Sequence, residues 1–173
     1  MNLSYTHLLP ENFPASSKVW IFQGGRQFTL SEVLQVEERL NSFSGQWHSH
    51  GSSVKNFVTV FFGQFIIVLA DDAETHVGGC STDSLNRAVK EIEAEFNVSL
   101  LNRQHLAFVV KDKIELLPLA QVSYALGNNF LTPDTLYFNN TVQTKEDLEN
   151  NWIVPIKNSW LAKRFALSSE VSQ

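Results

Sequence analysis

Apolar residues recur with helical spacing in some parts of the chain and form short continuous runs in others. The run at 19–22 holds only Val, Trp, Ile and Phe, which favour strands. A helix is predicted to follow, because the next apolar positions lie three or four residues apart. These positions are Val33, Val36, Leu40 and Phe43. Thr29 and Glu32 have the spacing of a capping box, which places the start of this helix.

Two further apolar runs have the composition of paired strands. Residues 54–62 and 65–70 are rich in Val, Ile and Phe. Gly63 and Gln64 lie between them and fit a two-residue type II′ turn, which takes glycine at its first central position. The second run is apolar on both faces, so we expect it to be a central strand.

A second helix is predicted over residues 82–96, with Asn97 as a left-handed C-cap. Its buried stripe consists of Leu85, Val89, Ile92 and Phe96. Residues 106–110 and 114–117 are predicted to form another pair of strands.

This order of elements predicts an α+β fold with the ferredoxin-like arrangement β-α-β-β-α-β, in which two helices cover one face of an antiparallel sheet. We expect residues 18–117 to form this core and residues 1–17 to be an extended lead-in. Residues 118–165 mix short helical and strand patterns without a linker, which predicts a C-terminal α/β appendage packed on the same core. The tail at 166–173 is predicted to be disordered.

Composition narrows the classes of partner. The chain has 173 residues, is 43% hydrophobic and carries a net charge of −5, which gives no general attraction to nucleic acid. Its most apolar stretch, 57–70, is too short and too interrupted to span a bilayer. One cysteine cannot form an intramolecular disulfide, and the start of the chain lacks the pattern of a signal peptide. We therefore expect a cytoplasmic protein with no nucleic-acid or membrane partner, and no pattern requires a cofactor.

The glycine-rich run at 78–84 gathers the most chemically useful residues. It reads Gly-Gly-Cys-Ser-Thr-Asp-Ser, follows an apolar strand and precedes the second predicted helix. A helix N-terminus presents free N–H groups and a partial positive charge, so it can hold a phosphate or carboxylate, and glycine lets a ligand approach the backbone. The run therefore indicates a binding or interaction module for a small anionic metabolite. The candidate ligand-binding residues are Gly78, Gly79, Ser81, Thr82 and Ser84.

The same run contains the only cysteine, which supports an alternative function. A helix N-terminus favours the thiolate, the nucleophilic form of the side chain, so Cys80 is a candidate nucleophile. His76 is the nearest histidine in sequence and the first candidate for its base, with His48 and His50 as alternatives. The protein would then be a thiol-dependent enzyme, either a hydrolase or a transferase.

A purely structural interpretation of the run also stays open. Ser81 or Thr82 can cap the helix, Asp83 can complement its dipole, and Cys80 can be a small buried packing residue. Three familiar phosphate-binding patterns are absent. No lysine follows the second glycine as in a Walker A loop, no G-x-G-x-x-G occurs, and the sixth position after the cysteine is not the arginine of tyrosine phosphatases.

Two histidines one residue apart form a weaker candidate site. If the chain is extended there, His48 and His50 point to the same face and could share a metal ion. Zinc sites take three or four ligands, so His76 or an acidic residue such as Asp71 or Asp72 would have to complete the set. The other interpretation is a loop that Trp47 anchors to the core while both histidines are solvated.

Aromatic residues gather around the predicted hairpin, at Phe57, Phe61, Phe62 and Phe65. Aromatic residues on a sheet can stack RNA bases, but the sequence pattern of RNA-recognition domains is absent and the net charge is negative. We therefore expect these residues to be core. A sheet face left apolar would pack against a second copy, which would make the protein a homodimer.

Three segments together carry a resemblance to a known family. They are Lys-Val-Trp-Ile-Phe-Gln at 18–23, Trp47-x-x-His50-Gly51, and Gly-Cys-Ser-Thr-Asp-Ser at 79–84. Over roughly residues 13–120 the chain resembles a family of uncharacterised bacterial proteins sometimes labelled "ABC transporter ATPase". The missing Walker A loop conflicts with that label. The resemblance implies a bacterial, cytosolic protein and transfers no activity.

Overall fold

The structure is a computed structural model that describes residues 1–167. It contains two compact units. We call Asn2–Asn102 with Gln143–Glu149 the N-terminal unit, and Met1, Arg103–Val142 and the residues from Asn150 onward the C-terminal unit. The end of the predicted disordered tail, 168–173, lies outside the described residues.

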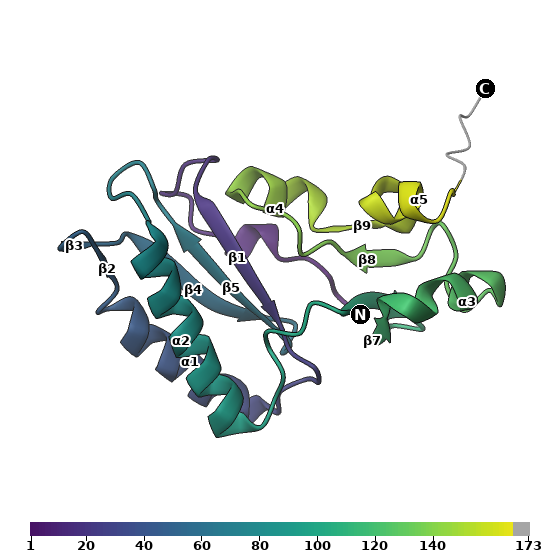
Figure 1. Ribbon diagram of the computed structural model, residues 1–173, viewed down its shortest axis with the longest axis horizontal. Helices are drawn as coiled ribbons and strands as arrows, with labels where there is room; N and C mark the ends of the chain where they lie inside the picture. Colours follow the sequence, from purple (N-terminus) through teal and green to yellow (C-terminus); the bar gives the residue numbers. More distant parts are fainter. Residues whose placement is uncertain (168–173) are drawn as a thin grey trace. The chain divides into compact units, whose positions relative to one another are not determined.

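The N-terminal unit is built on a three-stranded antiparallel sheet (Figure 1). Its order is β1 (Lys18–Gln23), β5 (Phe65–Ala70) and β4 (Asn56–Phe61). Strands β1 and β4 both run antiparallel to β5, and helix α1 (Leu30–Ser44) connects them along the chain. This is a β-α-β unit split by a central strand. Every residue of β5 is buried, which confirms the expectation of a central strand.

Helix α1 and helix α2 (Gly79–Phe96) pack on the same face of this sheet. Val36 and Leu40 of α1, with Leu85 and Val89 of α2, belong to one core with Ile66 and its neighbours on β5. The predicted capping box at the start of α1 is confirmed, because Thr29 Oγ1 accepts from Glu32 N and Glu32 accepts from Thr29 N. The predicted C-cap of α2 is confirmed too, since Asn97 has a left-handed backbone with φ 48°.

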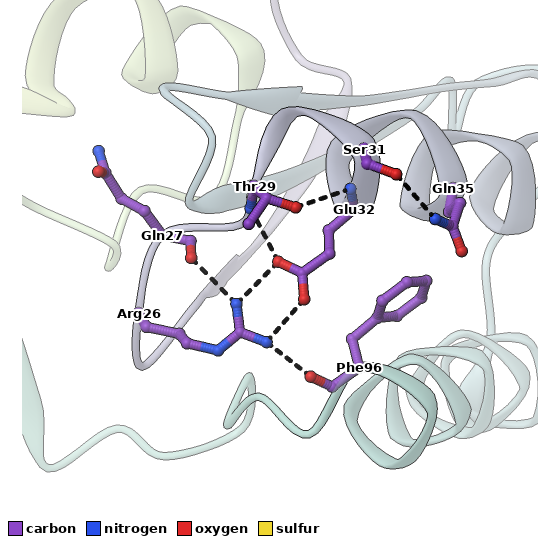
Figure 2. A network of polar contacts seen from close by, with 7 residues as sticks. All are labelled: Arg26, Gln27, Thr29, Ser31, Glu32, Gln35 and Phe96. Carbon is purple, nitrogen blue, oxygen red and sulfur yellow. Dashed lines mark hydrogen bonds and ion pairs between the residues drawn. The ribbon is translucent and has the colours of Figure 1, made fainter.

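A polar network joins the start of α1 to the end of α2 (Figure 2). Arg26 donates to both carboxylate oxygens of Glu32, at 2.8 and 2.9 Å, and to the Phe96 carbonyl at 2.7 Å. The same carboxylate accepts from Thr29 N at 2.8 Å. These contacts hold Glu32 in its ionised form, so its pKa falls from 4.5 to about 2, mainly through the Arg26 hydrogen bond.

The turn between β4 and β5 differs from the prediction by one residue. Its central residues are Phe62 and Gly63, with φ of 55° and 62°, and Gln64 N donates to Phe61 O at 3.1 Å. Two positive φ angles define a type I′ turn, whose twist matches paired strands, so the predicted type II′ turn at Gly63 and Gln64 is wrong. The turn leaves Gln64 free to enter the core, where it is buried.

The N-terminal residues are packed rather than simply extended. Tyr5, Leu9 and Phe13 are buried, and a short 3-10 helix, η1 (Thr6–Leu8), lies among them. The Tyr5 ring lies 5.9 Å from Phe61 and 6.3 Å from Phe62, between ring centroids. Phe61 and Phe65 are buried, as the core interpretation expects, whereas Phe57 and Phe62 are only partly buried.

The C-terminal unit has its own four-stranded antiparallel sheet, in the order β7 (Lys113–Pro118), β6 (His105–Val110), β8 (Leu136–Phe138) and β9 (Ile153–Pro155). Its core includes Phe108, Val122, Tyr137, Ile156 and Leu161. The other elements of this unit are short: η2 (Leu119–Gln121), α3 (Val122–Gly127), η3 (Ile156–Asn158) and α5 (Trp160–Arg164). Helix α4 (Lys145–Asn151) lies mostly within the segment Gln143–Glu149 of the N-terminal unit.

The α+β class is confirmed, but the ferredoxin-like sheet is not. That fold needs the strand after α2 in the same sheet as β1. Strand β6 instead pairs with β7 and β8, so both of its edges are occupied elsewhere. The predicted boundary between core and appendage at residue 117 therefore cuts through a sheet, whereas the two units divide after Asn102. Among the helices of the described residues, none is long and apolar enough to cross a membrane.

Candidate functional site

Helix α2 begins three residues earlier than predicted. It starts at Gly79, and Gly78 is its N-cap, with an extended backbone (φ −91°, ψ −175°) and no side chain to cap the helix. Ser81 and Thr82 therefore lie inside the helix, and the interpretation that either of them caps it is wrong. No acidic side chain occupies the first turn, so the positive end of the helix dipole has no carboxylate beside it there.

The three hydroxyl groups of the run donate to backbone carbonyls. Ser81 Oγ donates to His48 O at 3.2 Å, Thr82 Oγ1 to Gly78 O at 3.1 Å, and Ser84 Oγ to Cys80 O at 3.0 Å. Because each hydroxyl proton is donated to a carbonyl oxygen, the hydroxyl groups are not the free ligand donors that the sequence suggested. The structure leaves ligand donation at this site to the backbone.

The first backbone N–H groups of α2 are free. Thr82 N donates to Gly78 O at 3.1 Å, but no atom of the described residues accepts from the amides of Gly79, Cys80 or Ser81. The first amides of any α-helix lack a partner within the helix. In an 18-residue helix they carry the partial positive charge of the dipole.

A small hairpin, β2 (His48–Ser49) and β3 (Ser52–Ser53), lies against this helix end. Trp47 Nε1 donates to Ser81 O at 2.9 Å, and Ser49 Oγ donates to His76 O at 2.5 Å. Trp47 is buried, with its ring centroid 5.8 Å from that of Trp20 and 5.2 Å from that of Phe43. The indole therefore anchors the hairpin to the core, as predicted, and fixes it to the first turn of α2 as well.

His50 lies next to the N-cap of α2. A methyl group placed on Gly78 would lie 3.3 Å from His50 Nε2. His50 has φ 52° and Gly51 has φ 80°, so together they form the tight turn of the hairpin. The turn presents an exposed imidazole beside Gly78, the N-cap of α2, and glycine at this position leaves room for it.

The two neighbouring histidines do not form a metal site. His50 lies in a turn, so the extended geometry that would align it with His48 is absent. His48 Nδ1 lies 2.7 Å from Gln46 O, and its Nε2 lies 3.4 Å from Ser53 Oγ. Across residues 1–167, no group of three or more His, Cys, Asp or Glu side chains is placed to hold a metal ion.

Cys80 is exposed, so the interpretation that it packs in the core is wrong. Its thiol makes no hydrogen bond to any histidine in the described part of the chain. The candidate base His76 is also exposed, and its Nδ1 lies 3.3 Å from Asp72 Oδ1. The structure thus adds a carboxylate partner to His76 but does not show the base in contact with the nucleophile.

The sequence suggested Asp72 only as a possible metal ligand, and its contact with His76 was not predicted. Asp72 Oδ1 accepts from Val77 N at 2.7 Å and lies 3.4 Å from Lys18 Nζ. The Val77 hydrogen bond is the main cause of a lowered pKa at Asp72, followed in the same direction by the charge of Lys18. The only signal in the sequence was the four-residue spacing to His76, which has meaning in a helix but not in the loop found here.

Comparison with protein-family models, with curated proteins and with solved structures gave no match to this chain. The resemblance to the bacterial family therefore stays a prediction.

Proposed function

We propose that this protein is a binding module whose N-terminal unit holds a small anionic ligand, such as a phosphate ester, at the start of α2. The free amides of Gly79, Cys80 and Ser81 supply the hydrogen bonds. The observation that carries the proposal is the position of the His50 imidazole beside Gly78, at the same uncapped helix end. A protonated imidazole and the helix dipole would both favour the anion.

The surroundings favour an anion as well. Asp83 lies beyond the first turn, and that turn contains no acidic side chain. The Asp72 carboxylate is already engaged by Val77 N, Lys18 and His76. We also propose that the protein works in the cytosol of a bacterium, as its single cysteine and the family resemblance suggest.

Inorganic phosphate and simple phosphate esters are the probes for this site. We expect phosphate to raise the melting temperature of the wild-type protein, because a ligand that binds only the folded state stabilises it. His50→Asn keeps a residue that tolerates positive φ but removes the imidazole. It should weaken phosphate binding about tenfold by calorimetry, which is about 1.4 kcal/mol.

His48→Asn is the matched control, because both ring nitrogens of His48 have partners within its own hairpin. It should bind phosphate like the wild type. The proposal fails if phosphate and its esters leave the melting temperature unchanged, or if His50→Asn binds as tightly as the wild type.

The pair formed by Asp72 and His76 favours a second function, a thiol-dependent hydrolase or transferase with Cys80 as nucleophile. A carboxylate that accepts from Nδ1 orients an imidazole so that Nε2 can take a proton. Cys80 is exposed at the second position of α2, at the positive end of the helix dipole. In this function the imidazole would have to reach the thiol when substrate binds.

Alkylation by iodoacetamide separates the two functions. An activated Cys80 should react at pH 7 at least about tenfold faster than free glutathione, whose thiol is unactivated. His76→Asn should then slow the reaction, while His7→Asn, which changes an exposed histidine elsewhere, should not. A rate equal to that of glutathione, unaffected by His76→Asn, would exclude the enzyme.

A further inference from the structure

The outer edge of β4 is unpaired. Strand β4 lies at the end of the sheet and pairs only with β5. Asp71 N donates to Lys55 O at 2.9 Å. This hydrogen bond shows which residues of the β4 segment direct their backbone N–H and C=O groups toward β5, because the direction alternates along a strand. Lys55, Phe57 and Thr59 therefore point their backbone groups toward β5, and Asn56, Val58 and Val60 point theirs outward. Within residues 1–167, no group pairs with the backbone of Val58 or Val60.

Each other outer edge of the two larger sheets carries at least one feature that hinders further pairing, although on β1 (Lys18–Gln23) it covers only the Lys18–Val19 end. On the outer edge of β1, Val19 N donates to Gln143 O at 3.0 Å. Strand β7 carries Lys113 and Glu115 and ends in Pro118. Strand β9 has only three residues. Charges, prolines, short length and covering segments are the usual ways to prevent strand addition. Strand β4, with the sequence Asn-Phe-Val-Thr-Val-Phe, has none of them.

Exposed leucines lie on the same side of the unit. Leu30 and Leu34 of α1 are 78% and 61% exposed. Arg39 faces α2, since it donates to Glu95 at 2.8 and 3.0 Å. Leu30 is about two and a half turns from Arg39 and so lies on the opposite flank of α1. Helix α1 contacts β4, where Ser44 Oγ donates to Asn56 Oδ1 at 2.6 Å. The side of α1 that carries Leu30 and Leu34, which we call the leucine flank, therefore faces the unpaired edge of β4.

We propose that β4 is the interface of a homodimer, in which β4 of a second copy adds antiparallel about a twofold axis at Val58. In this register Asn56 of one copy faces Val60 of the other, and both exchange backbone hydrogen bonds through their outward groups. Phe57 faces Thr59. The two three-stranded sheets become one continuous sheet of both copies, and the α1 helices become neighbours across the axis.

A second copy fits this edge better than an unrelated strand. Because β4 has no charged residue, its antiparallel pairing with itself brings no like charges together. A twofold axis also carries each exposed leucine flank toward the α1 helix of the other copy, so that the apolar groups and the free backbone groups are covered together. The interface is independent of the anion site at α2.

The test is the oligomeric state of the full chain. Light scattering should give a mass twice the 19.6 kDa of one chain. Thr59→Lys and Thr59→Glu each place two like charges across the axis, so each should lower the dimer association constant by about tenfold or more. An equimolar mixture of the two variants should restore the dimer, because opposite charges then meet. Thr141→Lys, which adds the same charge at an exposed threonine of the C-terminal unit, should leave the dimer unchanged.

Amide exchange on the wild-type chain provides a readout that needs no variant. The amides of Val58 and Val60 should become protected as protein concentration rises across the dimerisation range. A monomeric wild type would overturn the proposal. So would a dimer that Thr59→Lys and Thr59→Glu leave intact, or one that forms without protection of these two amides, because the interface would then lie elsewhere.

Discussion

At the scale of single residues, glycine is needed at position 24 because a side chain would not fit there, and not because the backbone angle is unusual. A Cβ there would lie 2.8 Å from Arg26 O and 3.0 Å from Gln64 O. Gly24 N also donates to Gln64 O at 2.7 Å, and Gln64 Nε2 donates to Gly24 O at 3.0 Å. The two backbones are held together at this point, and neither can move away from a methyl group without losing these hydrogen bonds.

We expect Gly24→Ala to lower the free energy of unfolding by about 1–3 kcal/mol, the usual cost of overpacking. Gly79→Ala is the matched control, because a Cβ at that helical position meets nothing within 4 Å. It should be neutral or stabilise by up to about 1 kcal/mol, since alanine restricts the unfolded chain. Urea unfolding measures both changes. Equal stabilities of Gly24→Ala and the wild type would contradict the close approach seen here.

At the scale of elements, the network of Figure 2 makes the contact between α1 and α2 sensitive to low pH. The pKa of Glu32 is lowered to about 2 in the folded protein from an ordinary 4.5. The ionised form is therefore favoured by folding. Its stabilising contribution is complete above about pH 4.5 and is lost as the pH falls through about 2.

Glu32→Gln should reduce the dependence of stability on pH between about 4.5 and 2, because the variant has no carboxylate to protonate at this network. Glu37→Gln removes a carboxylate of the same helix and should retain the wild-type dependence. Thermal unfolding at a series of pH values gives the comparison. If the curves of Glu32→Gln and the wild type fall in parallel over this range, the network does not control acid stability.

Local patterns predicted much of the element structure but not the pairing of strands. The capping box of Thr29 and Glu32, the helical stripes and the left-handed Asn97 depend on residues a few positions apart, so the sequence contains their full cause. The neighbours of β6 depend on β8, far along the chain, and no local pattern names them. The ferredoxin-like prediction failed at that step.

In the candidate site too, contacts between residues far apart in the sequence were not predicted. The glycine-rich run indicated a helix start near Gly78 and Gly79 but placed it three residues late, and the exposure of the histidines was among the interpretations left open. The contact of Trp47 with Ser81 and the approach of His50 to Gly78 were not visible, because both join segments about 30 residues apart. The role of the hydroxyl groups was predicted wrongly, because serine and threonine side chains suit a ligand and a carbonyl partner equally well.

At the scale of the whole molecule, the N-terminal unit is discontinuous in sequence. Residues 143–149 belong to it although they follow most of the C-terminal unit. Lys145 N donates to Ser17 O at 2.9 Å, and the buried Lys145 Nζ donates to Phe13 O at 3.0 Å. Tyr5 OH donates to Leu148 O. The predicted order of lead-in, core and appendage could not include such a return, because composition shows no change at residues 143–149.

The place of residues 143–149 in the N-terminal unit also affects folding during synthesis of the chain. The carbonyl of Phe13 and the ammonium of Lys145 are 132 positions apart, so the ribosome must add all the residues between them before the two can meet. About 40 residues separate Asn102 from Gln143, which corresponds to a delay of roughly 2–8 seconds at ordinary rates of synthesis. During that interval the nascent N-terminal unit lacks one of its segments. The Lys18–Val19 end of its β1 edge is then open to other newly made strands, and the late arrival of residues 143–149 covers it.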